Sequence, residues 1–298
     1  MYGQIKPTAD PRTMNLPAPA APPRSMLFVS GERAERFPKA LAAGADLVCI
    51  DLEDAVHPDG KAEARARVLG WLADPASTAG RRCGIALRIN ALRTVEGLRD
   101  LVALVDAGVS LDWLLLPKTE DAADVACVAA WLGPRCPALA ALIETPLGIE
   151  RAFEITRHGA PLAALMLGGA DLSAELEARF DREGLQHARG RLVNAAKAAG
   201  LQAWDVPHVD LSSPEALADE TRHVVALGYG CKTAIHPQQI ATIHAAFRPS
   251  PADLDWARTL LAAVPEGAAS GAFLFQGRMV DAPLLRKARR IAELAQRA

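Results

Sequence analysis

Two carboxylates in this chain stand where buried strands would end. Glu144 closes the apolar run 139–144, and Asp171 follows the apolar run 163–168 after a short glycine-containing turn. The carboxyl ends of parallel strands meet at one rim, and oxygen ligands gathered there suit Mg²⁺, with Mn²⁺ as the alternative. The sequence therefore predicts that Glu144 and Asp171 bind a divalent metal. The competing interpretation is that Asp171 only caps the short helix after it.

A second group of charges follows an earlier apolar run. Asp51, Glu53 and Asp54 crowd one loop, and their repulsion must be relieved by a metal or by basic side chains such as Arg88 and Lys118. We expect Glu53 and Asp54 to hold metal-bound water and these basic groups around the metal ligands. The alternative is a solvated acidic loop that caps the next helix.

Arg88 lies inside the apolar run 84–90, and a buried arginine is rare unless it is paired. Its planar fork suits a carboxylate or an enolate oxygen, which predicts a catalytic contact; a salt bridge to Glu53 or Asp54 is the alternative, and the two are compatible. Gly169 and Ala170 precede Asp171, where free backbone N–H groups could hold a substrate carboxylate.

Eight apolar runs alternate with amphipathic stretches that predict helices. The runs are nearly continuous in hydrophobicity, as expected for parallel strands covered on both faces. Eight such units within about 220 residues favour a (β/α)₈ barrel with a C-terminal helical extension, and a doubly wound sheet is the alternative. The predicted strands are Met26–Ser30, Leu47–Asp51, Gly84–Asn90, Trp113–Pro117, Leu139–Glu144, Ala163–Gly168, Gln202–Val206 and Thr233–Ile235. The predicted helices are Glu32–Ala43, Pro58–Ala73, Val95–Ala107, Asp121–Leu132 and Leu185–Ala199.

These elements divide the chain into three parts. Residues 1–24 are rich in proline and alanine, which predicts a loosely ordered arm. Residues 25–249 hold the barrel. Residues 250–298 contain two further helices.

Composition narrows the function classes. The chain has 298 residues, half of them hydrophobic, and a formal charge of −2, which argues against nucleic-acid or anionic-membrane partners. Five cysteines without a C-x-x-C pair predict free thiols in a reducing compartment. No apolar run approaches the roughly 20 residues of a membrane span, and no signal peptide is evident, so a cytoplasmic protein is expected.

Seven motifs in order resemble the citrate lyase beta-subunit family, which includes malyl-CoA and citramalyl-CoA lyases. The resemblance covers the chain from about Arg24 to its end. The motifs are Arg24-Ser25-Met26-Leu27-Phe28-Val29, Asp51-Leu52-Glu53-Asp54-Ala55-Val56, Arg88-Ile89-Asn90, Leu116-Pro117-Lys118-Thr119-Glu120, Ile143-Glu144-Thr145, Gly168-Gly169-Ala170-Asp171-Leu172 and Lys232-Thr233-Ala234-Ile235-His236-Pro237.

The resemblance implies a Mg²⁺-dependent barrel lyase that forms a homo-oligomer, a trimer or hexamer. It implies that Glu144 and Asp171 bind Mg²⁺ and that Arg88 contacts the reacting oxygens. It also implies that Phe28, Arg33 and Lys39 hold CoA. A further implication is that Asp281, in the segment 277–283, reaches a neighbouring subunit's site and transfers a proton. These functional side chains are Phe28, Arg33, Lys39, Arg88, Glu144, Asp171 and Asp281.

The reaction so implied is reversible cleavage of a hydroxyacyl-CoA, such as malyl-CoA or citramalyl-CoA, to acetyl-CoA and a 2-oxo acid. Two departures leave the acyl substrate open: Ser30 replaces the family's usual proline, and Trp204 is expected near the barrel mouth. Three alternatives stay open: a metal-dependent aldolase acting on free 4-hydroxy-2-oxo acids, a malyl-CoA thioesterase, and a citrate lyase beta subunit that works only within a multi-chain complex.

Overall fold

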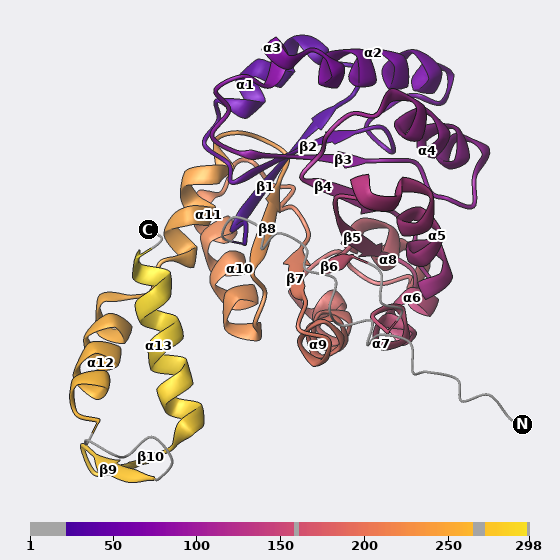
Figure 1. Ribbon diagram of the computed structural model, residues 1–298. Helices are drawn as coiled ribbons and strands as arrows, with labels where there is room; N and C mark the ends of the chain where they lie inside the picture. The colour runs from indigo at the N-terminus through magenta and orange to yellow at the C-terminus, as the bar shows by residue number, and fades with distance from the viewer. Residues whose placement is uncertain (1–21, 158–160, 265–271, 297–298) are drawn as a thin grey trace, which may run out of the picture.

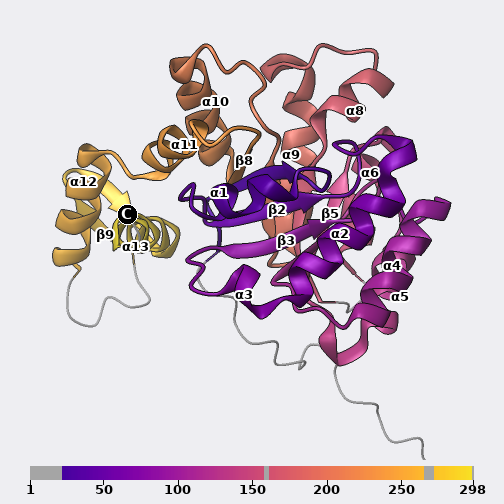
Figure 2. The same ribbon diagram turned by 90° about the horizontal axis from the view of Figure 1, so that it is seen from above.

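The chain forms a closed barrel of eight parallel strands in chain order, so the predicted (β/α)₈ fold is confirmed (Figures 1 and 2). The computed structural model describes residues 22–157, 161–264 and 272–296. Pairing of the first strand with the eighth closes the barrel and excludes a doubly wound sheet. The strands are β1 Ser25–Ser30, β2 Leu47–Asp51, β3 Gly84–Arg88, β4 Trp113–Leu116, β5 Ala138–Ile143, β6 Leu162–Leu167, β7 Gln202–Asp205 and β8 Cys231–Ala234.

Side chains alternate between the barrel interior and the layer beneath the helices, because successive residues of a strand point to opposite faces. In β2, Leu47 and Cys49 fill the interior, while Val48 and Ile50 pack against the helices. The interior core is completed by Met26, Ala86, Trp113, Leu115, Ala140, Leu142, Ala164, Met166, Trp204 and Cys231. The barrel is therefore a packed core, and functional groups must lie above its last apolar layer.

Helices surround the strands, as the amphipathic stretches predict (Figure 2). Their ends follow local chemistry: in α4 the Thr94 hydroxyl accepts the N–H of Gly97, and Gly108 ends the helix in a left-handed conformation (φ 61°). The helices are α1 Phe37–Leu41, α2 Lys61–Ala73, α3 Pro75–Thr78, α4 Val95–Ala107, α5 Ala122–Leu132, α6 Pro146–Glu150, α7 Ala152–Ile155, α8 Gly169–Glu175, α9 Arg182–Ala198, α10 Pro214–Leu227 and α11 Gln239–Phe247.

The first predicted helix is much shorter than expected. The stretch 32–43 contains a 3-10 turn, Ala34–Arg36, and only the five residues of α1. Pro38 lies in the first turn of α1 and has no N–H to donate, so a helix can begin there but cannot continue through it from residue 32. Gly44 follows with φ 83°, as expected of a residue that terminates a helix.

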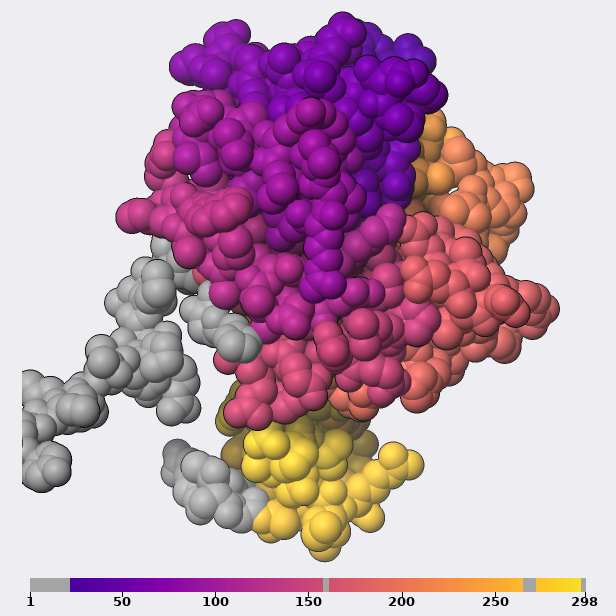
Figure 3. Space-filling model, turned by 90° about the vertical axis from the view of Figure 1, so that its right-hand side faces the viewer, coloured from indigo at the N-terminus to yellow at the C-terminus, as the bar shows by residue number. Residues whose placement is uncertain are grey.

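A separate lobe follows the barrel. Helices α12 Pro251–Ala262 and α13 Ala282–Gln296 pack on each other and flank a hairpin of β9 Phe273–Phe275 and β10 Arg278–Val280. The lobe has its own small apolar core and stands out from the barrel body (Figures 1 and 3). The hairpin is not anticipated by the sequence, because each of its strands has only three residues. The predicted arm lies mostly outside the described residues. No helix in the described ranges is long and apolar enough to cross a membrane.

Candidate active site

The alternation of side chains brings three residues to the uppermost interior layer. Phe28, Asp51 and Arg88 have the same parity as the interior core residues of their strands. Asp51 and Arg88 are also direct partners across β2 and β3. The sequence therefore places an arginine and a carboxylate side by side, above the last apolar layer of the barrel.

Arg88 makes a bidentate hydrogen bond with the Asp51 carboxylate. Its Nε and Nη2 donate hydrogen bonds to the two Asp51 carboxylate oxygens at 2.7 and 2.6 Å, and its guanidinium lies 5.1 Å from the ring centre of Phe28. Burial alone would lower the pKa of Arg88, but the hydrogen bonds and charge of Asp51 raise it well above its usual value. Arg88 is thus a permanently charged, rigidly oriented group. The sequence suggests Glu53 and Asp54 as its partners and leaves out Asp51, although strand pairing would have found it.

Glu53 lies on the other edge of Arg88. Arg88 Nη1 is 2.9 Å from Glu53 Oε2 and 3.6 Å from the more exposed Asp54. Burial, reinforced by repulsion from Glu144 and Asp54, raises the pKa of Glu53 to about 8, against the attraction of Arg88 and Lys118. Despite its ion pair with Arg88, Glu53 Oε2 is buried without a hydrogen-bond donor among the described residues. This oxygen is available to a further donor or cation.

Glu144 is fixed at the rim by its neighbours. The backbone N–H of Lys118 donates to Glu144 Oε1 at 2.7 Å, and only 3% of Glu144 is exposed. Gly168 packs directly on it: a Cβ built at this glycine would lie 2.3 Å from Glu144 Cβ and 2.4 Å from its Oε2. Burial raises the pKa of Glu144 even though the Lys118 N–H opposes the shift. A cation beside this carboxylate would compensate its desolvation.

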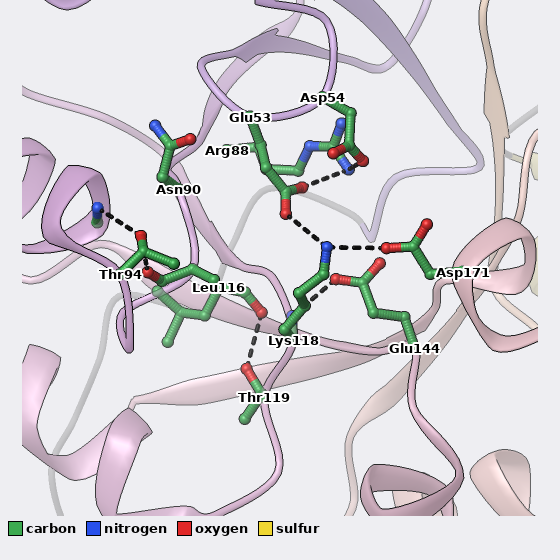
Figure 4. A network of polar contacts seen from close by, with 12 residues as sticks. Glu53, Asp54, Arg88, Asn90, Thr94, Leu116, Lys118, Thr119, Glu144 and Asp171 are labelled. Carbon is green, nitrogen blue, oxygen red and sulfur yellow. Dashed lines mark hydrogen bonds and ion pairs between the residues drawn. The ribbon is translucent and has the colours of Figure 1, made fainter. Parts of the chain in front are cut away.

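Asp171 lies next to Glu144, and Lys118 contacts both carboxylates. Lys118 Nζ lies 2.9 Å from Asp171 Oδ2 and 3.6 Å from Glu53 Oε1, so the ammonium group stands among the acidic side chains (Figure 4). Asp171 is in the first turn of α8, and the N-cap of that helix is Gly168. The interpretation of Asp171 as merely the N-cap is therefore wrong. The N–H groups of Gly169 and Ala170 belong to the same first turn, where no intrahelical acceptor is available.

This donor set fits a magnesium ion. Within the described ranges no three His, Cys, Asp or Glu side chains converge as a ready-made metal cluster. Mg²⁺, however, is commonly held by one or two carboxylates and keeps its other positions for water and substrate. Glu144 and Asp171 would supply such a pair, and the unsatisfied buried oxygen of Glu53 would accept a hydrogen bond from a coordinated water.

A large cavity is lined in part by Phe28, whose ring packs on Arg88. It has a volume of about 610 Å³ and is lined by the end of β1, the α1 region and the loop after β8. Phe28 and Lys39, both predicted to hold CoA, contribute to its wall, and so does Arg36, which the sequence does not single out. Arg33 is not part of the lining; its exposed guanidinium pairs weakly with Glu35 at 4.0 Å.

Asp281 lies in the C-terminal lobe, at the junction of β10 and α13. Its carboxylate accepts the N–H of Leu284 at 3.4 Å, a contact within the lobe. The lobe stands apart from the acidic rim of its own chain (Figure 1). A role for Asp281 in proton transfer therefore requires a neighbouring subunit, as the family resemblance implies.

Trp204 is not at the mouth of the barrel, contrary to expectation. It is fully buried in the interior core, where its ring centre is 4.6 Å from that of Trp113. Its indole N–H donates to Gln202 Oε1 at 2.8 Å. Because Trp204 is a core residue, it does not shape the entrance for the acyl substrate.

Asp205 ends β7 and Lys232 is the second residue of β8, and both face the helices. Their parity is opposite to that of the interior residues Trp204 and Cys231, and they pair with each other at 2.7 Å. Arg189 of α9 and Glu220 of α10 complete this buried ion cluster. These charges belong to the scaffold and not to the interior layer that holds Arg88.

A parallel (β/α)₈ barrel with an arginine and an acidic pair at the carboxyl ends of its strands has the architecture of a barrel enzyme. The chain belongs to the HpcH/HpaI aldolase/citrate lyase family, whose model matches residues 24–237. It is 40% identical over 266 residues to a citrate lyase subunit beta-like protein of Mycobacterium tuberculosis, covering 87% of this chain and 90% of the relative.

Two further relatives extend the comparison. An L-malyl-CoA/beta-methylmalyl-CoA lyase of Cereibacter sphaeroides is 33% identical over 314 residues, which cover 93% of this chain and 96% of the relative. The crystal structure of CitE from Mycobacterium tuberculosis, in complex with magnesium, acetoacetate and coenzyme A, is 38% identical. It superposes with a TM-score of 0.79 and covers 93% of this chain and 99% of that one. The family resemblance inferred from the seven motifs is thereby confirmed.

Proposed function

We propose that this protein is a Mg²⁺-dependent carbon–carbon lyase. It reversibly cleaves a hydroxyacyl-CoA, such as malyl-CoA or citramalyl-CoA, to acetyl-CoA and a 2-oxo acid. The observation that carries the proposal is the juxtaposition of a carboxylate pair, Glu144 and Asp171, with the rigid cation Arg88 and the cavity of about 610 Å³. A thioester in that cavity would lie against Phe28, whose ring packs on Arg88.

The two ends of the substrate have separate places in this arrangement. Mg²⁺ held by Glu144 and Asp171 would polarise the hydroxyl and carboxylate oxygens of the part that becomes the 2-oxo acid. The CoA part would occupy the cavity, with Phe28 against its apolar portion and the side chains of Arg36 and Lys39 near its phosphates. Arg33 would contribute only as an outlying charge. The N–H groups of Gly169 and Ala170 would face the substrate carboxylate.

Arg88 and Asp281 would share the chemistry. The hydroxyl proton would leave to solvent as the 2-oxo group forms, the bond between the carbinol carbon and the thioester α-carbon would break, and its electron pair would stay on the α-carbon as an enolate. Arg88 would stabilise this negative charge, a type of interaction that contributes about 3–4 kcal/mol to catalysis. Asp281 of a neighbouring chain would give a proton to the enolate carbon and would remove it again in the condensation direction. The proton that the enolate takes from Asp281 would be replaced from solvent.

The reaction is tested with the pure protein. With Mg²⁺ present, release of a 2-oxo acid is measured from malyl-CoA, citramalyl-CoA and methylmalyl-CoA, before and after EDTA and after Asp171→Ala. We expect EDTA and the substitution each to abolish release, and full activity with EDTA present would refute the metal role. Free thiol without a 2-oxo acid would identify a thioesterase instead.

The same preparation distinguishes the lyase from an aldolase and from a dependent subunit. Calorimetric titration with CoA separates a thioester enzyme from an aldolase of free 4-hydroxy-2-oxo acids, which has no use for the cofactor. Activity of the chain by itself separates a complete enzyme from a citrate lyase beta subunit that works only within a multi-chain complex.

A shared active site is tested by mixing inactive chains. Arg88→Ala lacks the barrel cation and Asp281→Ala lacks the lobe carboxylate, so a mixed oligomer would contain some sites with both groups. We expect part of the activity to return on mixing, together with a native mass of a trimer or hexamer. Absence of recovery despite demonstrated subunit exchange would place proton transfer elsewhere.

A further inference from the structure

Lys118, which follows β4, combines a left-handed backbone conformation with a charged side chain that contacts acidic residues. Its backbone is left-handed (φ 50°), a conformation that glycine adopts more readily than lysine. This turn aims the Lys118 N–H at Glu144 Oε1, 2.7 Å away. Glycine would meet the backbone requirement equally well, so what lysine adds at this position is its ammonium group.

That ammonium group holds one of the two carboxylates to which the metal is assigned. Lys118 Nζ lies 2.9 Å from Asp171 Oδ2 and 3.6 Å from Glu53 Oε1. Within the part of the chain that the structure describes, Lys118 is the only ion-pair partner of Asp171. Arg88 cannot substitute for it, because both carboxylate oxygens of Asp51 already bind the arginine fork.

The side chain of Lys118 also has space to move away from Asp171. It forms part of the wall of a cavity of about 230 Å³ between the loops after β3 and β4, together with Thr94 and Thr119. Its side chain is 41% exposed, so the flexible stem can move without disturbing the core. A lysine in this position can reach either Asp171 or a ligand bound at the rim.

We propose that Lys118 exchanges partners during binding: its ammonium group competes with the divalent metal for Asp171 and then pairs with the anionic substrate. The inference rests on the proposed metal-dependent function. A positive charge beside Asp171 weakens the binding of a second cation there. Once a 2-oxo acid brings its carboxylate to the rim, the same positive charge favours binding.

The proposal therefore predicts effects of opposite sign on two ligands. Removing the ammonium group should tighten metal binding and weaken binding of the anion. A purely structural role would weaken both, since the turn that aims the N–H at Glu144 would be lost. Lys118→Gly separates the roles, because glycine keeps the left-handed turn and its N–H while it removes the charge.

The test uses Mn²⁺ as the metal probe and pyruvate as the anion, with binding read by calorimetry and by the electron paramagnetic resonance of free Mn²⁺. For Lys118→Met and Lys118→Gly, we expect Mn²⁺ to bind about tenfold more tightly than to wild type, and pyruvate to bind the Mn²⁺-loaded protein about tenfold more weakly. Lys118→Arg, which keeps the charge, should stay near wild type for both ligands.

Two outcomes distinguish failure of this inference from failure of the metal site. Unchanged or weaker Mn²⁺ binding in both Lys118→Met and Lys118→Gly overturns the partner exchange while the metal site stands. If wild-type protein binds no Mn²⁺, or if Asp171→Asn binds it as tightly as wild type, the metal assignment is wrong and the inference fails with it.

Discussion

Gly168→Ala is the most direct test of how the acidic rim is built. The new Cβ would lie 2.3 Å from Glu144 Cβ and 2.4 Å from Glu144 Oε2. Since ordinary contacts begin near 3.4 Å, the two groups must separate by about 1 Å. Glu144 Cβ is next to the backbone and cannot rotate away, so either the end of β5 or the turn into α8 must shift. A displacement of about 1 Å at a catalytic group can reduce activity about 100-fold.

We expect the variant to bind Mn²⁺ at least about tenfold more weakly than wild type, in line with the effect of disturbing the surroundings of metal ligands. Overpacking of this kind also destabilises by about 1–3 kcal/mol, so the midpoint of thermal unfolding should fall by several degrees. Calorimetric titration and thermal unfolding measure the two effects. Wild-type metal affinity with unchanged stability would refute the geometry.

A matched control is available in α2. Gly70 is exposed in the interior of that helix, and nothing lies within 4 Å of a Cβ built on it. Gly70→Ala should therefore stabilise the protein by about 0.5–1 kcal/mol through the higher helix propensity of alanine, and it should leave metal binding unchanged. The comparison separates the close approach at Gly168 from the general effect of replacing a glycine.

Three further predictions concern other parts of the site and scaffold. Arg88→Lys keeps the charge but loses the fork to Asp51, so kcat/KM should fall about 100- to 1,000-fold in the 2-oxo acid assay; retention of more than half the activity would contradict this. Arg36→Ala should weaken CoA binding in calorimetry, whereas Arg33→Ala should not, because only Arg36 lines the large cavity; equal effects would disprove the assignment. Burial would raise the pKa of Glu220, but Lys232, His208 and Arg189 lower this pKa below its usual value. The stabilising effect of the Glu220 carboxylate is therefore present above its unfolded pKa of about 4.3 and is lost as the pH falls through the lower folded pKa. Glu220→Gln should therefore be less stable than wild type in urea at pH 7, with a gap that narrows below about pH 4; a gap independent of pH would count against it.

The sequence predicts the barrel well because its signals are local and repeated. Each strand is a short apolar run, and several helices have a clear start or stop, such as Thr94 and Gly108 around α4. The prediction fails where local signals are weak. The stretch 32–43 looks helical by composition, but Pro38 restricts it, and the strands of the β9–β10 hairpin are too short to show a pattern.

For the site, strand ends predict which residues gather at the rim but not which way they point. Parity along each strand supplies the missing information. Asp51 has the parity of interior residue Cys49 and meets Arg88, whereas Asp205 and Lys232 have the opposite parity and face the helices. Parity is readable from the sequence once the strands are known. The left-handed turn at Lys118 is not readable, because a lysine gives no local signal for it.

The charges that face the helices are connected to the cavity wall through a defined chain of contacts. Glu220, which pairs with Lys232, also contacts His208 Nδ1 at 2.6 Å. The carbonyl of His208 accepts the side-chain N–H of Gln239 at 2.7 Å, and the oxygen of the same amide accepts the backbone N–H of Ile235 at 2.9 Å.

Ile235 forms part of the wall of the large cavity that Phe28 and Lys39 also line. The buried ion cluster thus holds the loops after β7 and β8 together and sets the position of that wall. Buried ion pairs contribute little net stability compared with apolar packing of the same volume. What this cluster does provide is directional contacts, which fix two loops whose own sequences contain few apolar anchors.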